Sequence, residues 1–154
     1  MIFKFFKKIV NLFKKKEIEI FKGDYGITLV IFQKVGFVID EEDLDYFNNE
    51  FNKKPYRLVI VRSKNRKGKE ILYLARDNKN SNTPEYYHRL IMNKEIENFC
   101  KSKGCSKSEV VVHHINFNTK INTKSNLNVM TREQHDRLHN LNRDNLSQIK
   151  ITNY

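Results

Sequence analysis

Cysteine is scarce in this chain, which has only Cys100 and Cys105 among its 154 residues. With two thiols and Cys100 in a predicted helix, we expect reduced cysteines that bind no metal, in a cytoplasmic protein. Long apolar runs are also absent, and lysines interrupt the apolar residues near the N-terminus. We therefore expect neither a secretory signal nor a membrane-spanning segment.

Negative charge is in deficit, because 29 Lys and Arg residues outnumber 18 Asp and Glu and give a net charge of +11. Such a balance predicts a polyanionic partner. Nucleic acid is the obvious candidate, although membrane surfaces also attract basic proteins. The length suits one domain, or one small domain with an extension.

Residues 1–16 contain six lysines and no acidic residue. Their apolar residues follow helical spacing with the lysines largely opposite, which predicts a basic amphipathic helix. This helix could pack against the body of the protein, make a peripheral membrane contact through residues 2–16, or contact DNA phosphates.

Residues 17–80 form a predicted mixed strand and helix region that positions the substrate. Apolar segments at 18–21 and 27–32 predict a hairpin, and residues 37–39 predict a further strand. Residues 40–50 carry six acids and no base, which predicts a helix that begins near Asp40 and lies away from nucleic acid.

Residues 57–62 and 70–76 predict a second hairpin with a cationic connection. A basic tip could hold a phosphate backbone, or it could simply be solvated. The candidate DNA-binding residues of this tip are Lys64, Arg66, Lys67 and Lys69. The polar segment 77–84 is the predicted boundary to the next region, where residues 94–103 predict a helix capped by Asn93 and ended by Gly104.

The stretch 111–140 holds four of the five histidines. Residues 109–115 predict a strand, on which His113 and His114 point to opposite faces. Residues 127–130 predict a second strand. Thr131, with Gln134 three residues later, predicts a helix from about 132 to 139.

His135 and His139 are four residues apart on this predicted helix and share a face. Together with His113 they can converge on one metal with a coordination position left open, as in catalytic sites. His114 points elsewhere and remains free to act as a base, a role that suits an unperturbed pKa of about 6.5.

These positions resemble the HNH nucleases, also called ββα-metal or His-Me finger nucleases. The match consists of the pair His113-His114, Asn126 twelve residues later, His135 nine after that, and His139 four further on. The two helix histidines are similar to the bacteriocin DNase branch. The segment 88–90, His-Arg-Leu, is similar to the phage and intron-encoded branch, and the resemblance covers residues 86–140.

The resemblance implies a role for each residue. His114 would be the general base that activates water. His113, His135 and His139 would hold a divalent metal at the scissile phosphate and the leaving 3′ oxygen. Asn126 would brace the loop that orients His114, and Arg89 would contact a phosphate near the cut.

His113 stands where many members carry Asp, so the ligand set is all nitrogen. We expect one divalent ion, which could be Zn, Ni, Mn or Mg. Because magnesium prefers oxygen ligands, the all-nitrogen set favours Zn, Ni or Mn. Some members also carry two CxxC pairs around a structural zinc, and this chain lacks them.

We thus expect an α+β fold with a ββα-metal (HNH) core at residues 85–140 and a C-terminal tail at 141–154. The expected activity is metal-dependent hydrolysis of DNA by an enzyme of phage or mobile-element type, leaving 5′ phosphate and 3′ hydroxyl ends. The alternative is a zinc-stabilised DNA-binding module without turnover. Such a module would not need His114.

Overall fold

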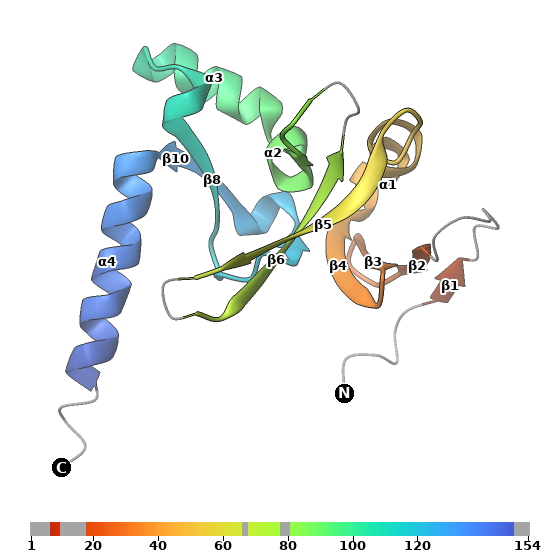
Figure 1. The fold of residues 1–154 in the computed structure, drawn as a ribbon, viewed down its shortest axis with the longest axis horizontal. Helices are drawn as coiled ribbons and strands as arrows, with labels where there is room; N and C mark the ends of the chain where they lie inside the picture. The colour runs from red at the N-terminus through yellow and green to blue at the C-terminus, as the bar shows by residue number, and fades with distance from the viewer. Residues whose placement is uncertain (1–6, 10–17, 66–67, 78–80, 150–154) are drawn as a thin grey trace.

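The computed structural model describes residues 7–9, 18–65, 68–77 and 81–149, which form a mixed α+β fold (Figure 1). The N-terminal sheet contains the predicted hairpin, β2 (Ile18–Lys22) and β3 (Ile27–Phe32), followed by β4 (Val35–Asp40). All three pair antiparallel. Alternate residues of β3 are buried, as expected for a strand with one face on the core.

The first strand differs from the sequence prediction. Residues 7–9 form β1 (Lys7–Ile9), which pairs antiparallel with β2, so the helix predicted for residues 1–16 is wrong at these positions. An edge strand offers unpaired backbone donors and acceptors, and pairing with it overrides a weak helical preference. The rest of that predicted helix lies outside the described residues, and so does most of the predicted membrane contact.

The acidic segment is helical but broken into short turns: η2 (Glu41–Asp43), α1 (Leu44–Tyr46) and η3 (Phe47–Phe51). Asp40 does not cap this segment with its side chain. Its Oδ2 instead accepts a hydrogen bond from the backbone N of Lys124 at 2.7 Å. The side chain of Asp40 therefore binds a distant part of the chain, at Lys124, and does not cap the helix that follows it.

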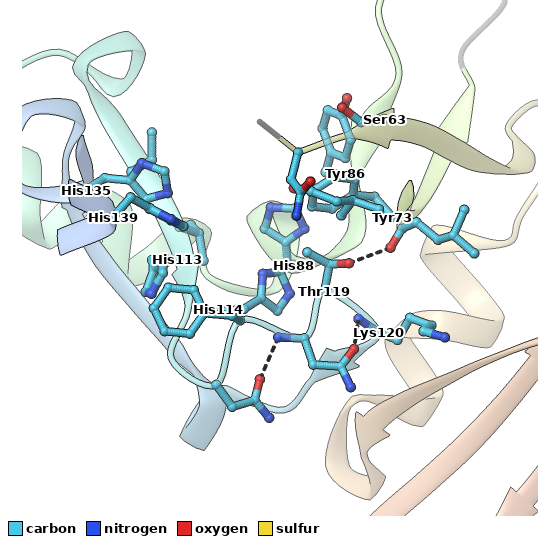
Figure 2. Close-up of a pocket in the computed structure, with 18 of the residues that line it drawn as sticks. Ser63, Tyr73, Tyr86, His88, His113, His114, Thr119, Lys120, His135 and His139 are labelled. Carbon is cyan, nitrogen blue, oxygen red and sulfur yellow. Dashed lines mark hydrogen bonds between the residues drawn. The ribbon is translucent and has the colours of Figure 1, made fainter. Parts of the chain in front are cut away.

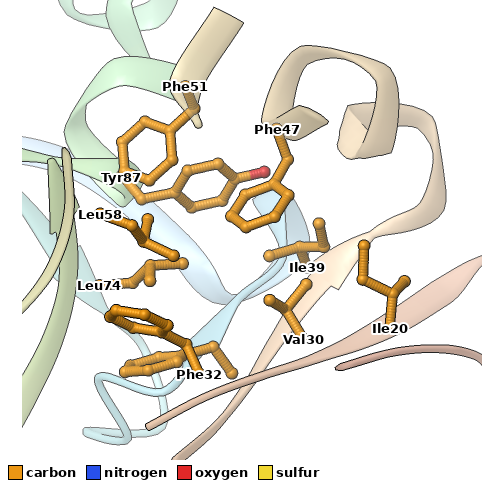
Figure 3. Close-up of a cluster of buried hydrophobic side chains, with 10 residues drawn as sticks. Ile20, Val30, Phe32, Ile39, Phe47, Phe51, Leu58, Leu74 and Tyr87 are labelled. Atoms are coloured by element: carbon orange, nitrogen blue, oxygen red, sulfur yellow. The ribbon is translucent and has the colours of Figure 1, made fainter. Parts of the chain in front are cut away.

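A second sheet contains the long hairpin β5 (Arg57–Lys64) and β6 (Glu70–Asp77), with β7 (Glu85–Tyr86) added beside β6. The predicted boundary at 77–84 thus lies between two strands of one sheet. The helix α2 (Tyr87–Ile91) follows directly. Figure 3 shows Tyr87 between Phe47 and Phe51 in the main core, where all three rings are fully buried.

The predicted helix at 94–103 is α3 (Asn93–Lys103), which ends at Gly104 with a φ of 65°. Asn93 is its first residue and not its cap. A second core lies between α3 and the sheet that follows. It contains Met92, Ile96, Val110, Val112 and Leu127. The turn η4 (Lys107–Glu109) leads into that sheet.

The last elements are β8 (Val110–His114), β9 (Ile121–Asn122), η5 (Lys124–Asn126), β10 (Leu127–Thr131) and α4 (Arg132–Ile149). β8 and β10 pair antiparallel, while β9 pairs in parallel with β4 of the N-terminal sheet. α4 continues to residue 149, so much of the predicted tail 141–154 is helical. No described helix is both long and apolar enough to cross a membrane.

Candidate active site

Three histidines from two elements meet on one side of β8. His113 comes from β8, and His135 and His139 come from successive turns of α4, as the spacing predicted (Figure 2). Their ring centroids lie 5.3 Å (His113 to His135), 5.3 Å (His113 to His139) and 4.4 Å (His135 to His139) apart. One nitrogen from each ring lies within 4.8 Å of the others. This spacing brings three nitrogen ligands within reach of a single ion.

The start of α4 fixes the two helix histidines. Gln134 N donates to Oγ1 of Thr131 at 3.2 Å, and Thr131 N donates to Oε1 of Gln134 at 2.9 Å. This is the predicted capping box, which satisfies two backbone donors at the helix start. Because β10 runs directly into the helix, the cap also sets where His135 stands relative to β8.

The environment of His113 suits a metal ligand. The residue is 5% exposed, and its Nε2 is buried with no hydrogen-bond partner among the described residues. Burial first, and then the neighbouring His135 and His139, lowers the pKa of His113 to about 4. The ring is therefore neutral at pH 7, as metal ligation requires. An orphaned buried nitrogen beside two more imidazoles fits a borderline or soft divalent ion.

His114 points to the other face of β8, as the strand alternation predicted. Its Nε2 lies 3.2 Å from Oδ1 of Asn122, and the side chain is buried. Burial lowers the pKa of His114, and the contact with Asn122 acts in the opposite direction. A neutral imidazole at pH 7 has a lone pair with which to accept a proton.

His88 and Tyr73 pack beside His114. The ring centroids of His88 and His114 are 4.9 Å apart in an edge-to-face arrangement, and Tyr73 lies 6.4 Å from His114. Burial lowers the pKa of His88 to about 3. His88 is thus a neutral packing residue at pH 7, and it is not part of the three-histidine group.

Asn126 makes the loop contacts that a bracing residue would make. Its Oδ1 accepts from the backbone N of Asn116 at 3.1 Å, and its Nδ2 donates to the backbone O of Ile121 at 2.8 Å. The backbone O of Asn126 also accepts from Ile115 N at 2.8 Å. Asn126 therefore joins both ends of the loop after His114.

Arg89 lies at the cleft, but its guanidinium is used inside the protein. Nη1 donates to the backbone O of Val110 at 2.8 Å, and Nη2 donates to the backbone O of Lys107 at 2.5 Å. These bonds tie α2 to the start of β8. The phosphate contact expected for Arg89 would have to use its remaining donors.

An open cleft of about 1170 Å³ joins the histidines to the tip of the β5–β6 hairpin. The tip contributes Ser63, Asn65 and Lys69 to its lining, and the site contributes all five histidines. Lys64 and Lys69 are exposed. Arg66 and Lys67 lie outside the described residues.

The sequence did not single out two residues of this site. Asn122 is one of four asparagines between residues 116 and 126, and nothing local distinguishes it. Phe117 has a φ of 60°. The centroid of its ring lies 5.0 Å from that of His113 and 5.2 Å from that of His139. Its side chain covers the three-histidine group from the loop and is 48% exposed to the cleft.

The described residues contain one further group with metal-ligand chemistry, formed by Asp40, Glu42 and Asp43. The ammonium of Lys124 lies 2.8 Å from Glu42 and 3.2 Å from Asp43. Hydrogen bonding to Lys124 lowers the pKa of Glu42. A cation of the protein therefore already pairs with two of these three acids.

Comparisons with protein-family models, curated proteins and solved structures each gave no match to this chain.

Proposed function

We propose that this protein is a metal-dependent DNA endonuclease of the HNH class, with β8, β10 and α4 as its ββα-metal core. The observation that carries the proposal is the three-histidine group, in which one ring nitrogen of each residue lies within 4.8 Å of the others and His113 has a buried, unpartnered Nε2. A base candidate, His114, stands next to it on β8 and lines the same cleft.

The residues divide the chemistry of phosphodiester hydrolysis. His114 takes the proton of the attacking water. His113, His135 and His139 hold the divalent ion, which supplies positive charge where negative charge develops on the phosphate and the leaving oxygen. Asn126 keeps the loop between β8 and β10 in place. The all-nitrogen ligand set favours Zn, Ni or Mn over Mg.

The cleft supports DNA as the substrate. It is open, it is continuous with the cationic hairpin tip, and the chain carries a net charge of +11. Phosphate contacts from Lys64 and Lys69 would position a strand without reading its sequence. The acidic segment 40–50 lines none of this cleft, which agrees with the expectation that it lies away from the nucleic acid.

The test is cleavage of supercoiled plasmid by protein stripped with a chelator, with Mg, Mn, Ni or Zn then added back. We expect one or more of these ions to restore nicking. His114→Ala should bind metal and DNA normally but cleave about 10² to 10⁴ times more slowly, which is the usual contribution of a general base.

A metal-binding control separates the two roles. His135→Ala should lose both metal and cleavage, whereas Arg137→Ala, an exposed change on the same helix, should lose neither. Equal cleavage by wild type and His114→Ala would contradict the assignment of the base. Tight DNA binding without cleavage under any ion would instead favour the zinc-stabilised binding module.

A further inference from the structure

Asn122 belongs to two parts of the molecule at once. It lies in the loop between β8 and β10, yet as part of β9 it pairs with Ile39 of the N-terminal sheet. The backbone N of Val38 also donates to the O of Lys120 at 2.8 Å. The side chain of Asn122 is 1% exposed, so its position is set by the protein and not by solvent.

The side chain of Asn122 meets one ring nitrogen of His114. Oδ1 lies 3.2 Å from Nε2, while Nδ2 of Asn122 is buried without a partner among the described residues. An amide oxygen can only accept a hydrogen bond. With the amide in this orientation, Nε2 carries the ring proton and the lone pair is left on Nδ1.

We propose that Asn122 is a positioning residue that holds His114 as the Nε2–H tautomer, so that Nδ1 is the nitrogen that accepts the proton of the attacking water. The catalytic part of this inference rests on the proposed nuclease function. As the water oxygen bonds to phosphorus, its proton passes to Nδ1. The bond from phosphorus to O3′ breaks with its electron pair on O3′, which takes a proton from solvent, and His114 later returns its proton to solvent.

The surroundings of His114 support a fixed ring. His88 meets the ring edge to face at a centroid distance of 4.9 Å, and Tyr73 stands beside it. These neighbours limit rotation of the imidazole, and the contact with Asn122 then selects which nitrogen is protonated. A carboxylate or carbonyl often has this role for catalytic and metal-bound histidines.

The first experiment reads the tautomer directly. Nitrogen NMR of the full chain, labelled at histidine, is recorded at pH 8 without DNA, and the His114 signals are identified by their loss in His114→Ala. We expect a protonated Nε2 and an unprotonated Nδ1. Asn122→Leu, which is similar in size but has no acceptor, should lose that preference, and Asn122→Asp should retain it. A protonated Nδ1 in wild type would overturn the proposal.

The second experiment measures cleavage. Asn122→Leu should lower kcat about 10- to 100-fold, the usual effect of losing such a supporting hydrogen bond, with little change in DNA affinity. Asp40→Ala is the matched control, because Asp40 anchors the same segment through Lys124 N without touching His114. Its kcat should stay near that of wild type. An equal loss of kcat in both variants would mean that Asn122 only anchors the loop and does not position His114.

The two proposals fail in different ways. A wild-type protein with the Nε2–H tautomer but no cleavage would overturn the nuclease function and leave the hydrogen bond from His114 to Asn122 intact. A wild-type protein that cleaves DNA, with an Asn122→Leu variant of unchanged tautomer and kcat, would overturn the positioning role alone.

Discussion

Burial determines what the histidines of the cleft can do. It is the largest cause of the lowered pKa of His88, His113 and His114. All three rings are neutral at pH 7, and their contacts then assign different tasks to them. His113 faces two other imidazoles, His114 faces an amide oxygen, and His88 faces aromatic rings.

His88 should make the stability of the protein depend on pH. Its pKa is about 3 in the folded state and about 6.5 when unfolded, so the unfolded chain binds the extra proton between these values. The stability that His88 contributes is complete above pH 6.5 and is lost as pH falls toward 3, by at most about 1.4 kcal/mol per pH unit.

Urea unfolding of wild type and His88→Phe at pH 7.5 and 5.0 measures this effect. Between pH 7.5 and pH 5.0 both proteins should lose stability. The loss in the free energy of unfolding should be about 2 kcal/mol smaller for His88→Phe than for wild type. Identical losses in the two proteins would show that His88 accepts a proton without cost in the folded state.

Sequence reasoning found the three-histidine group because its spacing is local. Strand alternation separates His113 from His114, and the helical repeat aligns His135 with His139. Asn122 could not be found in this way. Its contact with His114 depends on β9 pairing with β4, which is more than 80 residues away in the sequence.

At the scale of elements, the β5–β6 hairpin is the feature most directly open to a binding test. Its strands pair over eight positions, from Arg57 with Asp77 to Lys64 with Glu70, and its tip lines the cleft. Figure 1 shows the hairpin reaching from the N-terminal sheet toward α4. This arrangement would place a bound DNA strand between the cationic tip and the histidines.

Replacing both Lys64 and Lys69 by Ala should weaken DNA binding about equally for all sequences. If each lysine neutralises one phosphate, the slope of log affinity against log salt should become shallower by about 1.8. Binding isotherms at several salt concentrations give this slope. The matched control replaces Lys101 and Lys103 of α3 by Ala, because both lie outside the cleft. This variant should keep the wild-type slope. Equal changes of slope in the two double variants would contradict a specific role of the tip.

The elements that were predicted best have strong local signals. β2, β3, β5, β6, β8 and β10 follow runs of β-branched and apolar residues, and the start of α4 follows its capping box. The errors arose in segments whose secondary structure depends on tertiary contacts. Residues 7–9 pair with a sheet edge, and the helix predicted at 40–50 is divided into short turns over the aromatic core.

At the scale of the whole molecule, Tyr87 joins the parts before and after residue 84. Its ring is fully buried against Phe47 and Phe51, with centroid distances of 6.0 and 4.9 Å. The next residue, His88, packs on His114. One short helix therefore connects the main hydrophobic core to the candidate base.

Tyr87→Ala should lower the free energy of unfolding by about 3 to 5 kcal/mol, because it leaves a large cavity. Tyr87→Phe should be neutral or slightly stabilising, since the buried hydroxyl has no hydrogen-bond partner among the described residues. Denaturant unfolding of both variants checks this pair. A loss above about 2 kcal/mol in Tyr87→Phe would reveal a bond to that hydroxyl.

The pairing of β9 with β4 also has a consequence for how such a protein can evolve. Exchange of gene segments near residue 84 would give the histidines a foreign N-terminal half, and β9 would then have no partner strand. Asn122 would lose its anchor even though every histidine was inherited intact. The two halves must therefore change together, and a grafted three-histidine group would need an acceptor whose own sheet ends in a strand that can replace β4.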